Sequence, residues 1–174
     1  MIYVPTISNY KPFWIQQATG SAQDILTTYG VIVKAHDYPS SLKVKDPYKN
    51  QWHDEHGDEE YIPSTGLMVE AFTFNLECAM FAKAVTEDTA IADLNAGIRA
   101  FQAALRSGAL KTYDEYTGFG FQKVRVSEMQ NVSSDNYDVK DGMTRVIFNV
   151  TLKVNDPVTH MVKSGNNIVD ASTL

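Results

Sequence analysis

Cysteine is almost absent from this chain, because Cys78 is the only one among 174 residues. A single cysteine cannot form an intramolecular disulfide, so a packed hydrophobic core must stabilise the fold. Cys78 alternates with apolar residues in an extended pattern. We therefore expect it to be a small buried side chain in a protein that folds in a reducing compartment.

Long hydrophobic runs and an excess of positive charge are also missing. No stretch approaches the roughly 18 apolar residues of a membrane-spanning helix. The first ten residues lack the basic start and apolar segment of a signal peptide. The 15 Lys and Arg are outnumbered by 21 Asp and Glu, which gives a net charge of -6. We expect neither a membrane nor a sequence-specific nucleic acid partner, because phosphate binding needs clustered cations.

Two distant segments share an alternating apolar pattern that is typical of half-buried strands. Apolar residues occupy every second position in each segment: Phe72, Phe74, Leu76, Cys78 and Met80 in the first, and Val146, Phe148, Val150, Leu152 and Val154 in the second. Polar residues fill most of the positions between them. The pattern predicts two long strands that bury matching faces.

One amphipathic helix is predicted between these strands. Its apolar residues are spaced three, four, three and four positions apart: Ile91, Leu94, Ile98, Phe101 and Leu105. Thr86 or Asp88 can cap its start, and Gly108 suits the left-handed position after its last turn. The helix is expected over about residues 89–107.

Shorter patterns complete the predicted fold. Residues 13–16 and 29–35 have strand character, and residues 109–113 and 121–129 form a hairpin around the glycine-containing turn 116–120. We therefore expect an α+β fold in a single domain over residues 1–160: a mostly antiparallel β-sandwich or curled sheet with one main helix packed on it. Residues 161–174 show no period and are expected to form a flexible C-terminal tail.

The segment 42–63 is charged, contains two prolines, and predicts an extended loop or projecting hairpin. Within it, His53, His56 and Asp58 are residue types that bind zinc. Two histidines three positions apart share a face only on a helix, which Gly57 and the flanking prolines disfavour. We interpret the segment as a solvated loop that holds no metal or other cofactor. A metal-dependent hydrolase that uses these residues is the alternative.

Other candidates for catalysis are incomplete. Asp114 and Glu115 are adjacent acids, but neighbouring side chains diverge in a strand or turn. His36 and His160 have no Cys, Ser or Asp at an informative spacing. The chain also has no glycine-rich loop followed by a lysine and a helix, as phosphate binding requires. We expect no enzymatic activity.

Aromatic residues in the predicted loops and turns indicate an interface instead. Tyr and Trp are enriched at protein interfaces. The candidates are Tyr48, Trp52, Tyr61, Tyr116 and Phe119. Exposed sheet edges also favour association with copies of the same chain, so we predict a homo-oligomer. A monomeric ligand-binding module is a further alternative.

The order of these elements resembles the small sheet-plus-helix domain of tailed-phage distal tail, tail-tube and tail-terminator proteins. The resemblance covers about residues 29–157 and is carried by Phe72-Thr-Phe-Asn-Leu76, residues 92–108, Leu110, Val124-Arg-Val126 and residues 146–154. It implies a non-enzymatic virion structural protein, from a phage or prophage, that assembles in the bacterial host cytoplasm. It further implies a ring of six, contacts with other tail proteins, and a hairpin at 42–63 that embraces a neighbouring copy.

Overall fold

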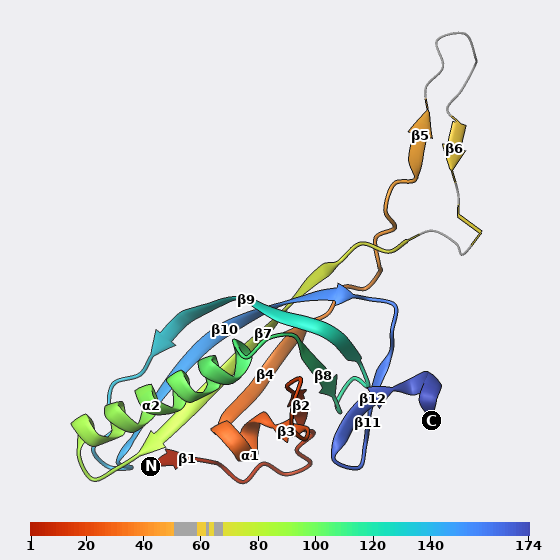
Figure 1. Ribbon diagram of the computed structural model, residues 1–174. Coiled ribbons are helices and arrows are strands. Elements are labelled where there is room, and N and C mark those ends of the chain that lie inside the picture. The colour runs from red at the N-terminus through yellow and green to blue at the C-terminus, as the bar shows by residue number, and fades with distance from the viewer. Residues whose placement is uncertain (51–58, 62, 65–67) are drawn as a thin grey trace.

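Two long antiparallel strands form the centre of the computed structural model of this chain (Figure 1). β7 (Phe72–Lys83) and β10 (Met143–Asp156) pair over twelve residues in one register, from Phe72 opposite Val154 to Lys83 opposite Met143. Their alternating residues lie on one face, where all except Phe72, which is half-buried, are buried. The predicted strands and their buried faces are therefore confirmed.

The structure describes residues 1–50, 59–61, 63–64 and 68–174, and the side chains of residues 1–47, 63–64 and 68–174. The sheet is completed by β1 (Ile2–Tyr3), β2 (Phe13–Gln16), β3 (Gln23–Asp24), β4 (Val31–Asp37), β8 (Leu110–Asp114) and β9 (Gly120–Ser134). Its order is β1-β7-β10-β9-β8-β2-β3, and β4 also pairs with β7. All these pairs are antiparallel. The sheet curls into a half-barrel, which confirms the α+β prediction and favours the curled sheet over the sandwich.

The main helix, α2 (Glu87–Leu105), packs along the sheet against β7 and β10 (Figure 1). The Thr89 N–H donates to Thr86 Oγ1 at 3.4 Å and caps its start. Leu94, Phe101 and Leu105 are buried as predicted, but Ile91 is 42% exposed. The prediction for Ile91 is wrong because Ala90 takes the buried position in the first turn.

A short helix that the sequence analysis did not identify leads into β4. In α1 (Ile25–Tyr29), the Asp24 carboxylate accepts the Leu26 N–H at 3.0 Å. Gly30 ends the helix at a φ of 70°, in the left-handed region that glycine adopts without strain. β4 therefore begins at Val31, two residues later than expected.

The C-terminal residues are ordered against the sheet, so the prediction of a flexible tail over 161–174 is wrong. β11 (Met161–Ser164) and β12 (Asn167–Asp170) form a hairpin that a 3-10 turn, η1 (Ala171–Thr173), follows. Met161 and Ile168 are buried, and the Ile168 N–H donates to Gln16 Oε1 at 2.6 Å. A Cβ at Gly120 would lie 2.0 Å from the Met161 carbonyl oxygen, so this docking requires glycine there.

The segment predicted as a loop or hairpin forms a hairpin that projects from the sheet (Figure 1). β5 (Tyr48–Asn50) and β6 (Glu59–Tyr61) pair antiparallel in a two-stranded sheet of their own. The two segments that lead to this hairpin are joined by an isolated antiparallel β-bridge between Val44 and Val69. The hairpin is therefore a separate arm on the main sheet.

Replacing Phe101 by Ala is expected to lower the free energy of unfolding by about 3–5 kcal/mol, because it leaves a cavity in the core. Phe101 is 1% exposed, and its ring lies 5.6 Å from that of Tyr29 and 6.2 Å from that of Phe148. Urea unfolding measures the loss. Arg99→Ala, at an exposed position of the same helix, is the control and should change the value by no more than about 0.5 kcal/mol. Equal effects of the two substitutions would show that the helix does not pack through Phe101.

Cys78 is expected to resist thiol reagents in the folded protein. Its side chain is fully buried. Burial is the main cause, and the neighbouring Glu77 charge the second cause, that raises the pKa of the thiol to about 12. The thiolate is the reactive species, so both its absence and its inaccessibility slow the reaction. Labelling with a chromogenic disulfide reagent should be complete in denaturant and nearly absent without it. Rapid labelling of the folded protein would contradict this burial.

Candidate functional site

Exposed apolar side chains gather where the hairpin leaves the main sheet. Five of them, at 42–72% exposure, define what we call the hairpin-foot patch: Leu42, Val44, Met68, Phe119 and Val158. Leu42, Phe119 and Val158 line a cavity of about 310 Å³, together with the rings of Phe72 and Phe121. An exposed apolar patch with a concave centre is typical of a protein interaction site.

A tight turn between β8 and β9 carries two of the predicted interface residues, Tyr116 and Phe119, and Phe119 lines this cavity. The Gly118 N–H donates to the Asp114 carbonyl at 2.8 Å, and the Asp114 N–H donates to the Phe119 carbonyl at 2.8 Å. Gly118 has a φ of 76°, which this turn requires. Phe119 is 46% exposed and Tyr116 is 74% exposed. Both side chains are therefore exposed on one turn, and Tyr116 lines a different cavity from Phe119.

The other predicted site residues belong to the segment 48–61. Tyr48 and Tyr61 are register partners across β5 and β6. The side chains of Tyr48 and Tyr61 lie outside the part of the chain that the structure describes. Four predicted residues lie outside it entirely: Trp52, His53, His56 and Asp58. Among the side chains that the structure does describe, no group of three or more His, Cys, Asp or Glu is placed to hold a metal ion.

A β-bulge in β4 creates a polar cluster that sequence spacing did not indicate. The pairing of β4 with β7 shifts between Val33 and Ala35, which leaves Lys34 as an extra residue. Simple alternation from Val31 and Val33 would turn Ala35 toward the core. The bulge instead turns His36 inward, and Tyr38, just beyond the strand, packs against the core.

The buried Asp114 carboxylate is the centre of this cluster. It accepts hydrogen bonds from the Tyr116 N–H at 2.9 Å, the Thr117 hydroxyl at 2.8 Å and the Tyr38 hydroxyl at 3.3 Å. His36 Nδ1 lies 3.6 Å from the same carboxylate. Sequence spacing indicated no Cys, Ser or Asp partner for His36, and only the fold, which brings β4 and β8 together, reveals the pair with Asp114. Burial, followed by the Asp114 charge, raises the pKa of Tyr38 above its ordinary value, so its hydroxyl remains a donor.

His36 and Asp114 also line the floor of an open cavity of about 540 Å³ between β4 and residues 7–13. The imidazole lies between two rings, with centroids 5.2 Å from Tyr38 and 5.5 Å from Tyr116. The cluster thus joins β4 to β8 and lines a cavity that polar groups can enter.

A second exposed apolar patch surrounds the start of α2. We call it the helix-start patch, and its members are Tyr3, Val85, Ile91 and Val139, with Val85 97% exposed. The Tyr137 hydroxyl donates to the Ala84 carbonyl at 2.7 Å, and the Ala84 N–H donates to the Gly142 carbonyl at 2.9 Å. These hydrogen bonds hold the turn that carries Val85 against the loop that carries Val139. Sequence reasoning missed both patches because their members are dispersed along the chain.

β9 also leaves part of a sheet edge without a neighbouring strand. β8 pairs with β9 only as far as Val124, whereas β10 pairs with β9 as far as Ser134. Within the described part of the chain, residues 125–134 therefore have a paired strand on one side only. Two register shifts in the β9–β10 pairing interrupt this edge, and such bulges commonly limit edge-to-edge association.

Comparison with protein-family models, curated protein sequences and solved structures finds no match to this chain. None of the helices in the described residues is both long and apolar enough to cross a membrane.

Asp114→Ala is expected to lower the free energy of unfolding by about 3 kcal/mol, because it removes a charged acceptor and leaves the half-buried hydroxyls of Tyr38 and Thr117 without this partner. Glu115→Ala is the matched control. Glu115 is exposed and accepts one hydrogen bond, from Trp14 Nε1 at 3.2 Å, so a change within about 0.5 kcal/mol is expected. Denaturant unfolding compares the two variants. Equal stabilities would show that the Asp114 cluster does not join β4 to β8.

Proposed function

We propose that this protein is a non-enzymatic structural protein of the tail or neck of a phage or prophage virion, and that it acts by assembling with copies of itself into a ring. The β5–β6 hairpin carries this proposal, because it pairs with no other described strand and projects beyond the sheet. An isolated two-stranded hairpin is at best marginally stable in water. Contact with a neighbouring copy would stabilise such a hairpin.

The two apolar patches support self-association independently of the hairpin. Val85, Val139 and Val158 are each more than 70% exposed. Clustered aliphatic side chains this exposed mark interaction surfaces in soluble proteins. A chain with two such surfaces at different places can contact two neighbours, as every member of a ring does.

The ring size, the partners and the location rest on the resemblance to tail proteins. On this proposal six copies form the ring, other tail proteins contact it, and assembly takes place in the bacterial host cytoplasm before the ring enters the virion. The net charge of -6 disfavours a role in binding DNA directly.

The test is the mass of the purified protein, measured by light scattering and native mass spectrometry, with negative-stain microscopy of any assembly. The proposal predicts a ring at about six times the chain mass of 19.4 kDa. Replacing residues 48–61 with a short Gly-Ser linker should shift the population toward monomers. The same variant should keep the circular dichroism spectrum and melting temperature of the main sheet, because β5 and β6 form a separate two-stranded sheet.

Two results would contradict this function. The first is a monomer at every accessible concentration. The second is stoichiometric zinc that is lost in a His53→Ala, His56→Ala double variant, which would favour the metal-dependent hydrolase. An assembly whose mass is unaffected by the hairpin replacement would leave self-assembly standing but remove the hairpin from the interface.

A further inference from the structure

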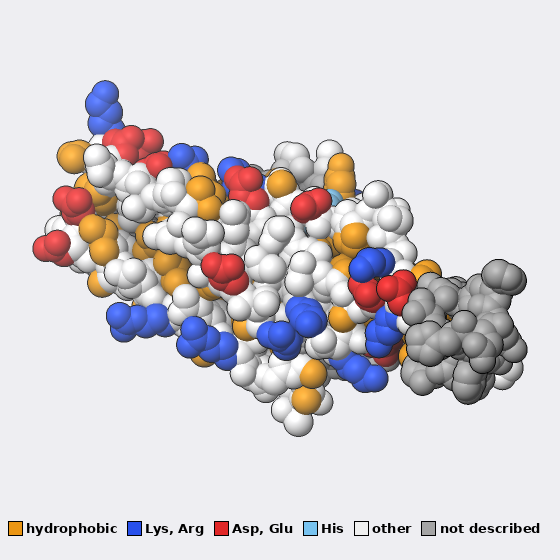
Figure 2. Space-filling view, turned by 90° about the horizontal axis from the view of Figure 1, so that it is seen from above, with side chains coloured by type: hydrophobic (Ala, Val, Ile, Leu, Met, Phe, Trp, Pro, Cys, Tyr) orange, Lys and Arg blue, Asp and Glu red, His pale blue; other side chains and the backbone are white. Residues whose placement is uncertain are grey.

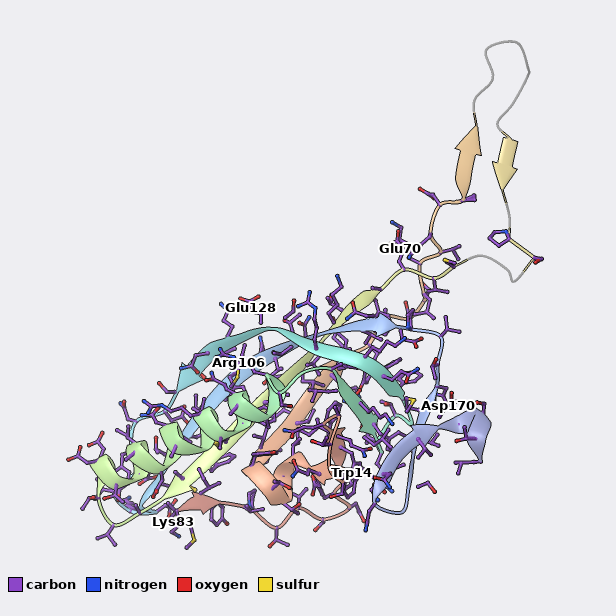
Figure 3. The ribbon with its side chains drawn as sticks, in the orientation of Figure 1. Trp14, Glu70, Lys83, Arg106, Glu128 and Asp170 are labelled. Atoms are coloured by element: carbon purple, nitrogen blue, oxygen red, sulfur yellow. The ribbon has the colours of Figure 1, made fainter. Side chains whose placement is uncertain are left out.

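Two segments of the chain that lie end to end cover one edge of β7 near its end. β4 pairs with this edge as far as Met80, and β1 continues the cover over Phe81 and Ala82. The Lys83 N–H then donates to the Met1 carbonyl at 3.1 Å. Figure 1 shows β1 beside this end of β7, which Lys83 marks in Figure 3. Because β4 occupies the next position along the edge, the chain leaves the sheet after β1, which is only two residues long.

Ile2 of β1 fills a socket that two glycines make possible. A Cβ at Gly30 would overlap Ile2 Cγ2, and a Cβ at Gly97 would lie 2.7 Å from Ile2 Cδ1 and 2.9 Å from Met80 Sδ. Gly97 lies inside α2, where glycine lowers the stability of a helix relative to alanine. The contact with Ile2 gives this glycine a physical reason. The socket is therefore matched to an aliphatic side chain on an extended segment.

The segment that fills the socket has few other attachments. The side chains of Tyr3 and Val4 are exposed, and Ile2 itself is half-buried. The Met1 ammonium pairs with Asp93 of α2 at the surface, and exposed ion pairs add little stability. Beyond Val4 the chain enters no helix or strand before β2. Segments with so few buried contacts open locally at a free energy far below that of global unfolding.

The walls of the site do not depend on β1. Residues 81–83 of β7 remain paired with β10 along the other edge of the strand. Met80 is fully buried in the core, and Gly97 is held within α2. Release of β1 would therefore leave a free strand edge beside a preformed socket. A free edge of this kind is a template for pairing with another extended segment.

The site adjoins the helix-start patch, of which Tyr3 is a member. Figure 2 shows hydrophobic side chains exposed among acidic ones at the end of the molecule opposite the grey residues. At this end β7 leads into α2. A segment that pairs with residues 81–83 would thus lie beside apolar side chains that are already exposed.

We propose that residues 1–4 are a releasable strap that occupies a strand-binding site at the end of β7. When the strap detaches, residues 81–83 and the socket accept an extended segment of another chain that places an aliphatic side chain against Gly97. The strap identifies this class of ligand, because it pairs as a β-strand and inserts an isoleucine. The inference goes beyond the proposed function and does not rest on it, since it concerns a single copy.

Native-state hydrogen exchange of the wild type tests the release of the strap. The Lys83 amide should exchange by local opening, at least about tenfold faster than the Val150 amide and with little dependence on low concentrations of denaturant. Val150 is fully buried, and its strand is paired on both sides. Equal rates with equal denaturant dependence would show that β1 opens only when the whole sheet unfolds, which would overturn the inference.

Two variants of the full chain release the strap in different ways. Ile2→Asp places a charge in the apolar socket, and Gly97→Leu fills the socket from α2 with a good helix former. Both should speed exchange of the Lys83 amide by about tenfold or more and keep the circular dichroism spectrum and melting temperature of the sheet. Thr6→Asp, at an exposed position of the same segment outside β1, is the control and should match the wild type.

A labelled peptide with the sequence of residues 1–6 is the probe for the open site. Fluorescence polarisation should show saturable binding to Ile2→Asp, whose socket is empty. Binding to the wild type and to Gly97→Leu, whose sockets are filled, should be at least about tenfold weaker. The same peptide with aspartate at its second position should bind none of the three proteins.

Three results would overturn the inference. The first is exchange of the Lys83 amide that is unchanged in both Ile2→Asp and Gly97→Leu. The second is loss of the whole sheet in both variants, which would make the segment an integral part of the core. The third is a peptide that binds all three proteins alike or binds none of them. Each of these results leaves the proposed self-assembly untouched, because none depends on the mass of an assembly.

Discussion

The register of β7 with β10 is the constraint on which the rest of this structure depends. The two strands pair over twelve residues without a shift, and their alternating side chains supply much of the core. A slip of either strand by one residue would turn the apolar face of that strand toward solvent. The register therefore determines where α2 packs, and it places the two ends of β7 at fixed positions. One end leads into the hairpin foot and the other into the turn before α2.

The curl of the sheet depends on contacts between strands that do not pair. β4 pairs with one edge of β7. β8 lies on the other side of β7, beyond β10 and β9. The Asp114 cluster joins them, because the bulge at Lys34 turns His36 inward and Tyr38 reaches the same carboxylate. A buried carboxylate with several donors is stable only while those donors stay in place. The same cluster orders the turn that presents Tyr116 and Phe119, so the curl of the sheet and the shape of the hairpin foot are coupled.

Local periodicity predicts the central part of this fold, and contacts between distant residues explain what it misses. Residue spacing predicts the strands at 72–80 and 146–154 and most of the apolar face of the helix. Each of these elements repeats its pattern over several turns or alternations. β11 and β12 have one buried residue each, Met161 and Ile168, and their burial depends on Gln16 and Gly120 far away in the sequence. The bulge in β4 shifts the alternation by one residue, so the approach of His36 to Asp114 has no sequence signal. Tyr116 and Phe119 were identified as surface aromatics, whereas the aliphatic members of both patches are scattered along the chain.

The rigidity of β7 has a consequence for any assembly built from this chain. Its two ends hold the hairpin-foot and helix-start patches in a fixed relative orientation, because β7 is paired along both edges for most of its length. When one contact between copies repeats, the angle between its two surfaces decides whether the copies close into a ring or continue as a filament. A flexible connection between the patches would allow several angles and therefore mixed assemblies. A central strand that is paired on both sides restricts this angle, and a chain built in this way can specify a single closed size through the geometry of one strand.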